Sequence, residues 1–162
     1  MQLQGIISQN TYQKVLGAAD SLEPKASRLF EKALRSPNGL NRLLRKEVKP
    51  IPVFDEVYGQ ARMKHQYDMG TRSVRLDQIN GTLNRGTDFD AGFRPIQRHS
   101  ENRWLRVATA MLRGMDLPPL ELVKVGEQYF VKDGHHRVSV ARALGYQYLD
   151  AHISAYEFEE AA

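Results

Sequence analysis

The chain has 162 residues, of which 41% are hydrophobic and 26% are charged, as is typical of a globular protein with a core of its own. It has no cysteine, which excludes disulfides, thiolate metal sites and cysteine nucleophiles. The N-terminus lacks a basic segment followed by an apolar one, and no apolar run reaches the roughly 20 residues that span a bilayer. We therefore expect a cytoplasmic protein with no membrane partner.

The excess positive charge lies in the first third of the chain. Residues 1–48 carry eight Lys or Arg and four Asp or Glu, whereas residues 49–162 carry fifteen of each kind. The spacing of apolar residues predicts three short helices in this third: 11–20, 22–35 and 38–48. A basic helical arm of this kind fits a DNA contact through residues 25–48, and it equally fits an ordinary solvated helix face.

The arm ends at Pro50 and Pro52, which a helix interior does not accommodate. Residues 59–71 are polar and predict a loop. We therefore divide the chain into a helical N-terminal extension, residues 1–70, and a main domain, residues 71–162.

The main domain mixes strands and helices. Its expected elements are a strand (73–79), a long loop (80–99), a helix (101–113), a β-hairpin (120–132), a helix (135–144) and a strand (148–153). The hairpin is the clearest of them, because Gly126 at the first position of a two-residue turn fits a type II′ connection. Long loops within small domains are often functional, so residues 80–99 also merit attention.

The turn before the helix of residues 135–144 carries the most chemistry. A helix start offers backbone N–H groups and a partial positive charge, both of which suit a phosphate. Gly134 lets a ligand approach the backbone, and His135, His136 and Arg137 add donors and positive charge. Helices normally favour acidic residues in the first turn, so this reversal predicts that a ligand supplies the negative charge. We predict an anion site, for a nucleotide phosphate, built from Asp133 and these four residues.

Other interpretations of the same residues stay open. We favour Asp133 as the helix N-cap, although it could instead orient a histidine or hold a metal ion that accompanies the phosphates. Adjacent helical residues point about 100° apart, so His135 and His136 do not suit one metal ion. A zinc site that includes His99 or His152 stays an alternative, and no metal site is predicted. The turn could also be a polar, exposed helix start with no ligand. Arg142, farther along this helix, is expected to be solvated.

Two parts of the chain resemble the ParB/sulfiredoxin superfamily. The strand, turn and helix that bind the ligand in that superfamily are similar to residues 131–145, VKDGHHRVSVARALG. Its opening strand is similar to residues 74–79, VRLDQI. The order of elements fits residues 72–155, which is about half of the chain.

This resemblance implies an α+β fold, a small mixed sheet with packed helices, preceded here by the N-terminal arm. It also implies a nucleotide ligand, CTP or ATP/ADP, with Mg²⁺ as a companion of the phosphates. Gly134, His136 and Arg137 match the turn of sulfiredoxin. His135 stands at the position of the catalytic cysteine of sulfiredoxin, which excludes that activity.

Three functions follow from the resemblance. The first is a ParB-like nucleotide-binding module, associated with DNA through the basic arm. The second is a small-molecule kinase that acts on a free amino acid, with substrate or metal contacts from the strand and loop: Asp77, Arg85, Asp88 and Arg94. The third is an interaction domain without a ligand. The residues do not decide whether catalysis occurs, and a homodimer is an expectation from such domains in general.

Overall fold

The computed structural model describes residues 22–34, 49–83 and 88–159. Residues 22–34 form a helix, and the elements that follow are α3 (Phe54–Tyr58), β1 (Met63–Arg75), η1 (Leu76–Gln78), β2 (Ile79–Thr82), η2 (Arg98–Ser100), α4 (Glu101–Leu112), β3 (Leu120–Val125), β4 (Gln128–Asp133), α5 (His135–Ala143) and β5 (Tyr148–Phe158).

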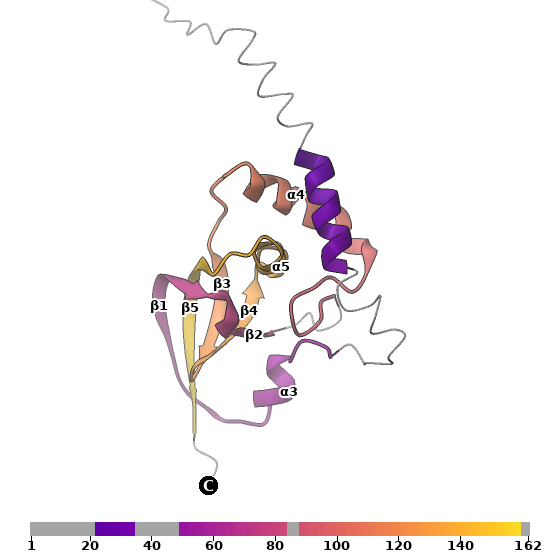
Figure 1. The fold of residues 1–162 in the computed structure, drawn as a ribbon. Coiled ribbons are helices and arrows are strands. Elements are labelled where there is room, and N and C mark those ends of the chain that lie inside the picture. Colours follow the sequence, from indigo (N-terminus) through magenta and orange to yellow (C-terminus); the bar gives the residue numbers. More distant parts are fainter. Residues whose placement is uncertain (1–21, 35–48, 84–87, 160–162) are drawn as a thin grey trace, which may run out of the picture.

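The strands form one mixed sheet in the order β1-β5-β3-β4-β2 (Figure 1). β5 pairs antiparallel with β1 and parallel with β3, while β4 pairs antiparallel with β3 and parallel with β2. The expected α+β fold with a small mixed sheet and packed helices is confirmed.

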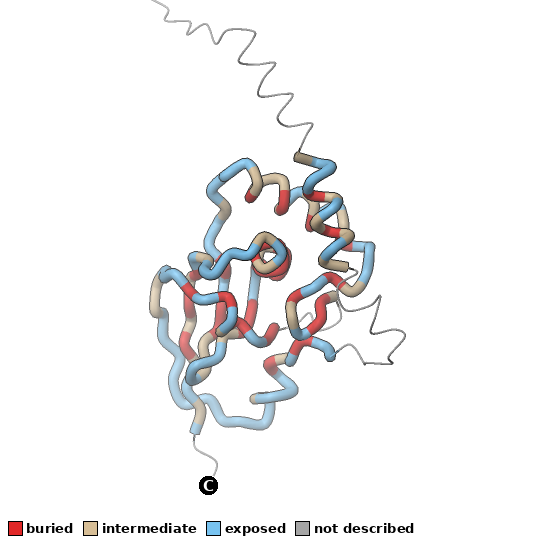
Figure 2. Tube along the Cα trace, viewed as in Figure 1, coloured by how far each residue is buried: buried red, intermediate tan, exposed pale blue. Residues whose placement is uncertain are grey.

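Helices α5 and α4 lie on one side of the sheet, and the helix of residues 22–34 lies beside α4 (Figure 1). Leu122 and Ile153 from the sheet, Trp104 from α4 and Val138 from α5 share a continuous core with Phe30 from the N-terminal helix. The rings of Phe30 and Trp104 meet edge to face, with centroids 5.4 Å apart. Figure 2 shows this buried centre beneath the helices. The N-terminal helix is therefore part of the core and not a detached arm.

The opposite face of the sheet is covered at one end by α3. Neighbouring residues of a strand point to opposite faces, so Phe130 lies on this face while Val131 lies in the main core. Phe54 of α3 contacts Phe130 edge to face at 5.3 Å, and Tyr58 stacks on Phe158 at 5.2 Å. This aromatic cluster anchors the segment that follows Pro52.

Several predicted elements are confirmed. Residues 22–34 of the helix predicted at 22–35 are helical, and residue 35 lies outside the described residues. The helices at 101–113 and 135–144 correspond to α4 and α5. In the hairpin turn, Gly126 has a φ of +57° and Glu127 does not have a positive φ. A type II′ turn requires a positive φ at its first central residue alone. The predicted helices at 11–20 and 38–48 lie outside the described residues.

The prediction of a loop over residues 59–71 is wrong. Most of that range belongs to β1, which is the edge strand of the sheet and is exposed over most of its length. A strand without a buried face has no reason to alternate apolar and polar residues, so its sequence does not show a strand pattern. The predicted division between residues 70 and 71 falls within this strand, and it stays a prediction.

Candidate functional site

Gly134 sets the geometry of the predicted phosphate turn. It is the N-cap of α5 and adopts the left-handed region, with φ +106°. A Cβ atom at this position would collide with the Leu120 side chain and would lie 3.1 Å from Nη2 of Arg137. Both the backbone angle and the close approach therefore require glycine. The first hydrogen bond of the α5 ladder runs from the N–H of Val138 to the carbonyl of Gly134, at 3.0 Å.

The two histidines of the turn are buried. Nε2 of His135 lies 2.6 Å from Oγ1 of Thr82, and its ring stacks on Phe89 with centroids 6.2 Å apart. The His136 ring meets the same phenyl ring edge to face, at 5.3 Å. These side chains join the start of α5 to the residues around the long loop. The start of α5 is therefore not an exposed polar helix start, because both histidine side chains are buried.

Arg137 joins the turn to the connection that precedes β3. Its side chain is 14% exposed, its Nη1 donates to the carbonyls of Pro118 and Pro119, and its Nη2 pairs with Oδ2 of Asp133 at 2.6 Å. The favoured interpretation of Asp133 as the N-cap is wrong, because Gly134 occupies that position and Asp133 binds Arg137 instead. The left-handed glycine shifts the helix start one residue beyond the carboxylate.

A depression of about 150 Å³ opens at this helix start, lined by all five predicted residues, Asp133–Arg137. Three more residues line it: Lys132 from β4, and Arg103 and Val107 from α4. The sequence did not single these out. Lys132 adjoins the turn and could have been found, whereas Arg103 lies about 30 residues earlier and only helix packing brings it here.

The depression is positively charged. Arg103 is exposed and forms no ion pair with another residue of the described ranges. Lys132 pairs with Glu121 at 3.3 Å, and both of these side chains are more than half exposed, so this pair is weak. Asp133 is the acidic residue of the lining, and Arg137 neutralises it. The positive end of the α5 dipole adds to these charges. The arrangement can hold a small anion.

The other predicted contacts lie elsewhere. Asp77 pairs with Arg75 in the exposed η1 turn, and the hydrogen bond from Arg75 lowers the pKa of Asp77. Oδ1 of Asp88 lies 3.4 Å from Nε2 of His99. Arg94 lines a separate cavity beside the second half of α5. Arg85 lies outside the described residues. The structure therefore does not bring Asp77, Asp88 or Arg94 to the depression.

Metal ligands do not gather in the parts of the chain that the structure describes. No group of three His, Asp or Glu side chains there is placed to hold an ion. No helix in the same ranges is long and apolar enough to cross a membrane.

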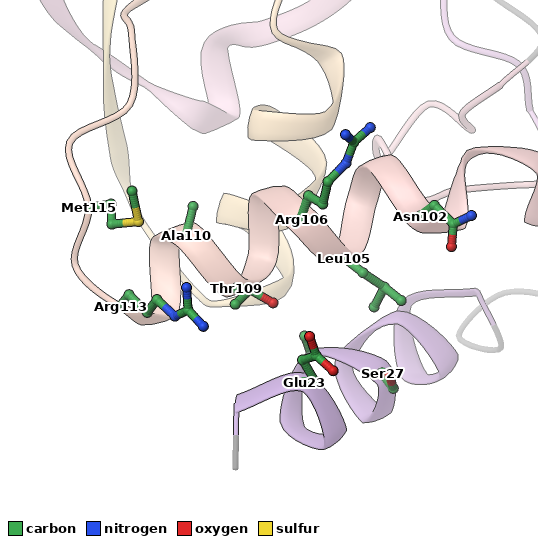
Figure 3. A pocket seen from close by; sticks show the side chains of 10 residues that line it. Glu23, Ser27, Asn102, Leu105, Arg106, Thr109, Ala110, Arg113 and Met115 are labelled. Atoms are coloured by element: carbon green, nitrogen blue, oxygen red, sulfur yellow. The ribbon is translucent and has the colours of Figure 1, made fainter. Parts of the chain in front are cut away.

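A larger groove, of about 610 Å³, lies between α4 and the helix of residues 22–34 (Figure 3). Leu105 and Thr109 line it from α4, and Glu23 and Ser27 line it from the N-terminal helix. None of the predicted site residues lines this groove.

No family model matches the sequence, and no curated protein does. Among solved structures, sulfiredoxin from Arabidopsis thaliana is 18% identical, with a TM-score of 0.39 over 51% of this chain and 82% of that one. A conserved hypothetical protein from Pyrococcus furiosus is 20% identical, with a TM-score of 0.38 over 54% of this chain and 33% of that one. This chain thus spans about a third of the second protein. These similarities are limited to the fold.

Proposed function

We propose that the depression at the start of α5 binds the phosphate of a nucleotide. The observation that supports this most is the lining of the depression: Lys132 and Arg103 stand beside the positive end of a helix, and the acidic residue in the lining is already neutralised. The resemblance of residues 131–145 to the ligand-binding turn of the ParB/sulfiredoxin superfamily extends the proposal from phosphate to nucleotide, CTP or ATP/ADP.

The size of the depression limits what enters it. Pockets that enclose a whole drug-sized ligand measure roughly 300–1,000 Å³, and this one measures about 150 Å³. A phosphate group would sit in it, while the sugar and base would lie over the neighbouring surface. Mg²⁺ would be held mainly by the phosphates and water, because magnesium sites usually keep several waters.

Thermal unfolding of the full chain tests the proposal. ATP, ADP, CTP and sulfate are added in turn, and at least one nucleotide should raise the melting temperature in a saturable manner. Arg103→Gln and Lys132→Gln should each weaken the binding by about tenfold, since each removes a charge that a phosphate would pair with. Both side chains are exposed, so these variants should fold as the wild type does.

Matched controls come from exposed cations elsewhere. Arg106→Gln changes the same helix outside the depression, and Lys64→Gln changes β1. Both should keep the full ligand-induced shift. If none of the four anions shifts the melting temperature, or if Arg103→Gln and Lys132→Gln respond as the wild type does, the proposal is wrong. Arg137→Ala should also abolish the shift, but it loosens the turn itself and is less specific.

A DNA contact is a second candidate, favoured by one surface. Lys25, Arg28 and Lys32 are all exposed and lie at i, i+3 and i+7 of the N-terminal helix, which places them on one face opposite Ala26 and Phe30. Such a stripe would contact backbone phosphates and no base edges.

Binding of duplex DNA at several salt concentrations tests this candidate. Lys25→Gln with Arg28→Gln should weaken binding and lower the salt slope by about one per lost phosphate contact. An affinity that does not depend on salt would exclude the stripe as a DNA contact. The kinase alternative has less support, because Asp77 and Asp88 lie outside the depression. A homodimer stays a prediction.

A further inference from the structure

A second basic cavity lies beside the other half of α5. It measures about 360 Å³ and is enclosed by segments that are far apart in the sequence: the helix of residues 22–34, the turn of residues 90–94 and the end of α5. Three cationic side chains line it, Lys32, Arg94 and Arg142. Leu29 and Ala33, both partly exposed, supply apolar walls, and among the described residues none of those that line it is acidic.

Arg142 is held rigidly at this cavity. Its Nη2 donates to the carbonyls of Leu76 and Ile79, at 2.6 and 2.8 Å. Its guanidinium carbon lies 4.9 Å from the centre of the Phe93 ring, in a cation–π contact. Nε and Nη1 donate to no acceptor in the described part of the chain. The side chain is therefore fixed in place and still has donors to offer.

The charge of Arg142 is not neutralised by a direct partner. The structure shows no ion pair between this side chain and a carboxylate of the described residues, and the side chain is half-buried. Burial lowers the pKa of Arg142, and the charges of Asp77 and Asp90 oppose this shift without cancelling it. A half-buried cation of this kind is stabilised by any anion that enters beside it.

The turn of residues 90–94 is built to present its side chains to the cavity. Oδ1 of Asp90 accepts the N–H groups of Gly92 and Arg94, at 2.8 and 2.9 Å. A Cβ atom on Gly92 would lie 3.2 Å from the same oxygen. Phe93 adopts φ +59°, which a non-glycine residue rarely does. Strained backbone of this kind is kept where the surrounding structure requires it, and it often marks a binding site. Here it places the Phe93 ring against the guanidinium of Arg142. It also places the exposed Arg94 side chain in the lining of the cavity.

We propose that this cavity binds a small organic anion, a carboxylate or phosphate with an apolar body, between Lys32, Arg94 and Arg142. The anionic group would take the remaining donors of Arg142 and the charges of Lys32 and Arg94. The apolar body would lie against Leu29 and Ala33. The volume falls within the roughly 300–1,000 Å³ that encloses a small molecule. This site is separate from the depression at the start of α5, and it does not depend on nucleotide binding there.

Calorimetric titration of the full chain tests the proposal, with benzoate as a carboxylate probe and phenyl phosphate as a phosphate probe that carries the same ring. At least one of them should bind saturably with one site per chain. Arg94→Gln should weaken that binding about tenfold and Lys32→Gln several-fold, because both side chains are exposed and serve the ligand more than the fold. Which probe binds more tightly would decide between a carboxylate and a phosphate ligand.

The matched controls are Lys64→Gln and Arg72→Gln, which change exposed cations of β1. Both should bind the probe as the wild type does. The proposal is overturned if neither probe binds, or if Arg94→Gln and Lys32→Gln bind it unchanged.

Arg103→Gln separates this site from the depression at the start of α5. It should leave the probe titration unchanged while it weakens nucleotide binding about tenfold, and Arg94→Gln should weaken the binding of the probe and leave nucleotide binding unchanged. If Arg103→Gln abolishes the binding of benzoate or phenyl phosphate, the probe occupies the α5 start and the cavity proposal is wrong. If nucleotides fail to bind but the probe responds to Arg94→Gln, the cavity proposal stands alone.

Discussion

Two arginines of α5 both donate hydrogen bonds to pairs of backbone carbonyls, but they differ in whether a carboxylate pairs with them. Arg137 holds the carbonyls of Pro118 and Pro119, and Arg142 holds those of Leu76 and Ile79. Arg137 also pairs with a carboxylate at 2.6 Å, whereas Arg142 has no such pair among the described residues.

The difference teaches that a conspicuous arginine is not necessarily the one that is available to a ligand. Arg137 stands in the most suggestive motif of the chain, and the fold uses much of its bonding capacity. Arg142, expected to be solvated, is half-buried beside a cavity. The prediction that Arg137 contacts phosphate stays a prediction. We therefore rest the tests of binding on Arg103, Lys132 and Arg94.

The largest expected effect is that of Gly134→Ala, which tests whether backbone geometry builds the start of α5. We expect a loss of roughly 2–5 kcal/mol in the free energy of unfolding, the sum of about 1–2 for a left-handed alanine and about 1–3 for crowding against Leu120. Urea denaturation measures it. Gly145→Ala is the control, because Gly145 has φ +79° but nothing within 4 Å of an added Cβ. Equal losses in the two variants would mean that close packing does not constrain the turn.

Arg137→Ala tests the structural use of the first arginine. It should lower the free energy of unfolding by about 1.5–3 kcal/mol, because a largely buried guanidinium no longer donates to the carbonyls of Pro118 and Pro119. Asp133→Asn should cost only about 0–1 kcal/mol, since the Asp133 side chain is 60% exposed. Urea denaturation of both variants measures the two losses. A larger loss for Asp133→Asn would show that the ion pair, and not the carbonyl contacts, holds the turn.

Arg142→Met should cost less than Arg137→Ala, about 1 kcal/mol. It too removes hydrogen bonds to two carbonyls, but it also removes a half-buried charge without a direct ion pair, which offsets part of the loss. The same urea titrations give the comparison, with Arg113→Met as an exposed control. A loss that exceeds that of Arg137→Ala would mean that the charge of Arg142 is well compensated in the folded protein.

The smallest expected effect is that of Asp77→Asn, which removes one of the two charges that act on Arg142 from a distance. The pKa of Asp77 is lowered in the folded protein, chiefly by the hydrogen bond from Arg75. Its contribution to stability is therefore present above the unfolded pKa of about 3.9 and is lost as the pH falls through the lowered folded value. The difference between wild type and variant should shrink below about pH 4. Asp116→Asn, an exposed control, should show a smaller difference at neutral pH.

The sequence by itself determined the elements with strong local patterns. The hairpin follows from Gly126, α4 and α5 follow from their apolar spacing, and the turn of α5 follows from a glycine before three basic or potentially basic residues. Each of these depends on neighbours within a few positions, and such signals are readable from one chain.

Only the tertiary structure decided the edge strand, the start of α5 and which charged side chains lie close together. The sequence predicts a loop over most of β1, because an exposed edge strand has no buried face to impose a pattern. The sequence favours Asp133 as the N-cap, but the left-handed Gly134 moves the helix start by one residue. Arg103 reaches the depression through helix packing, and Arg142 reaches its cavity through contacts with residues more than 60 positions away. A sequence shows which residues can carry charge, but desolvation and pairing depend on neighbours that only folding supplies.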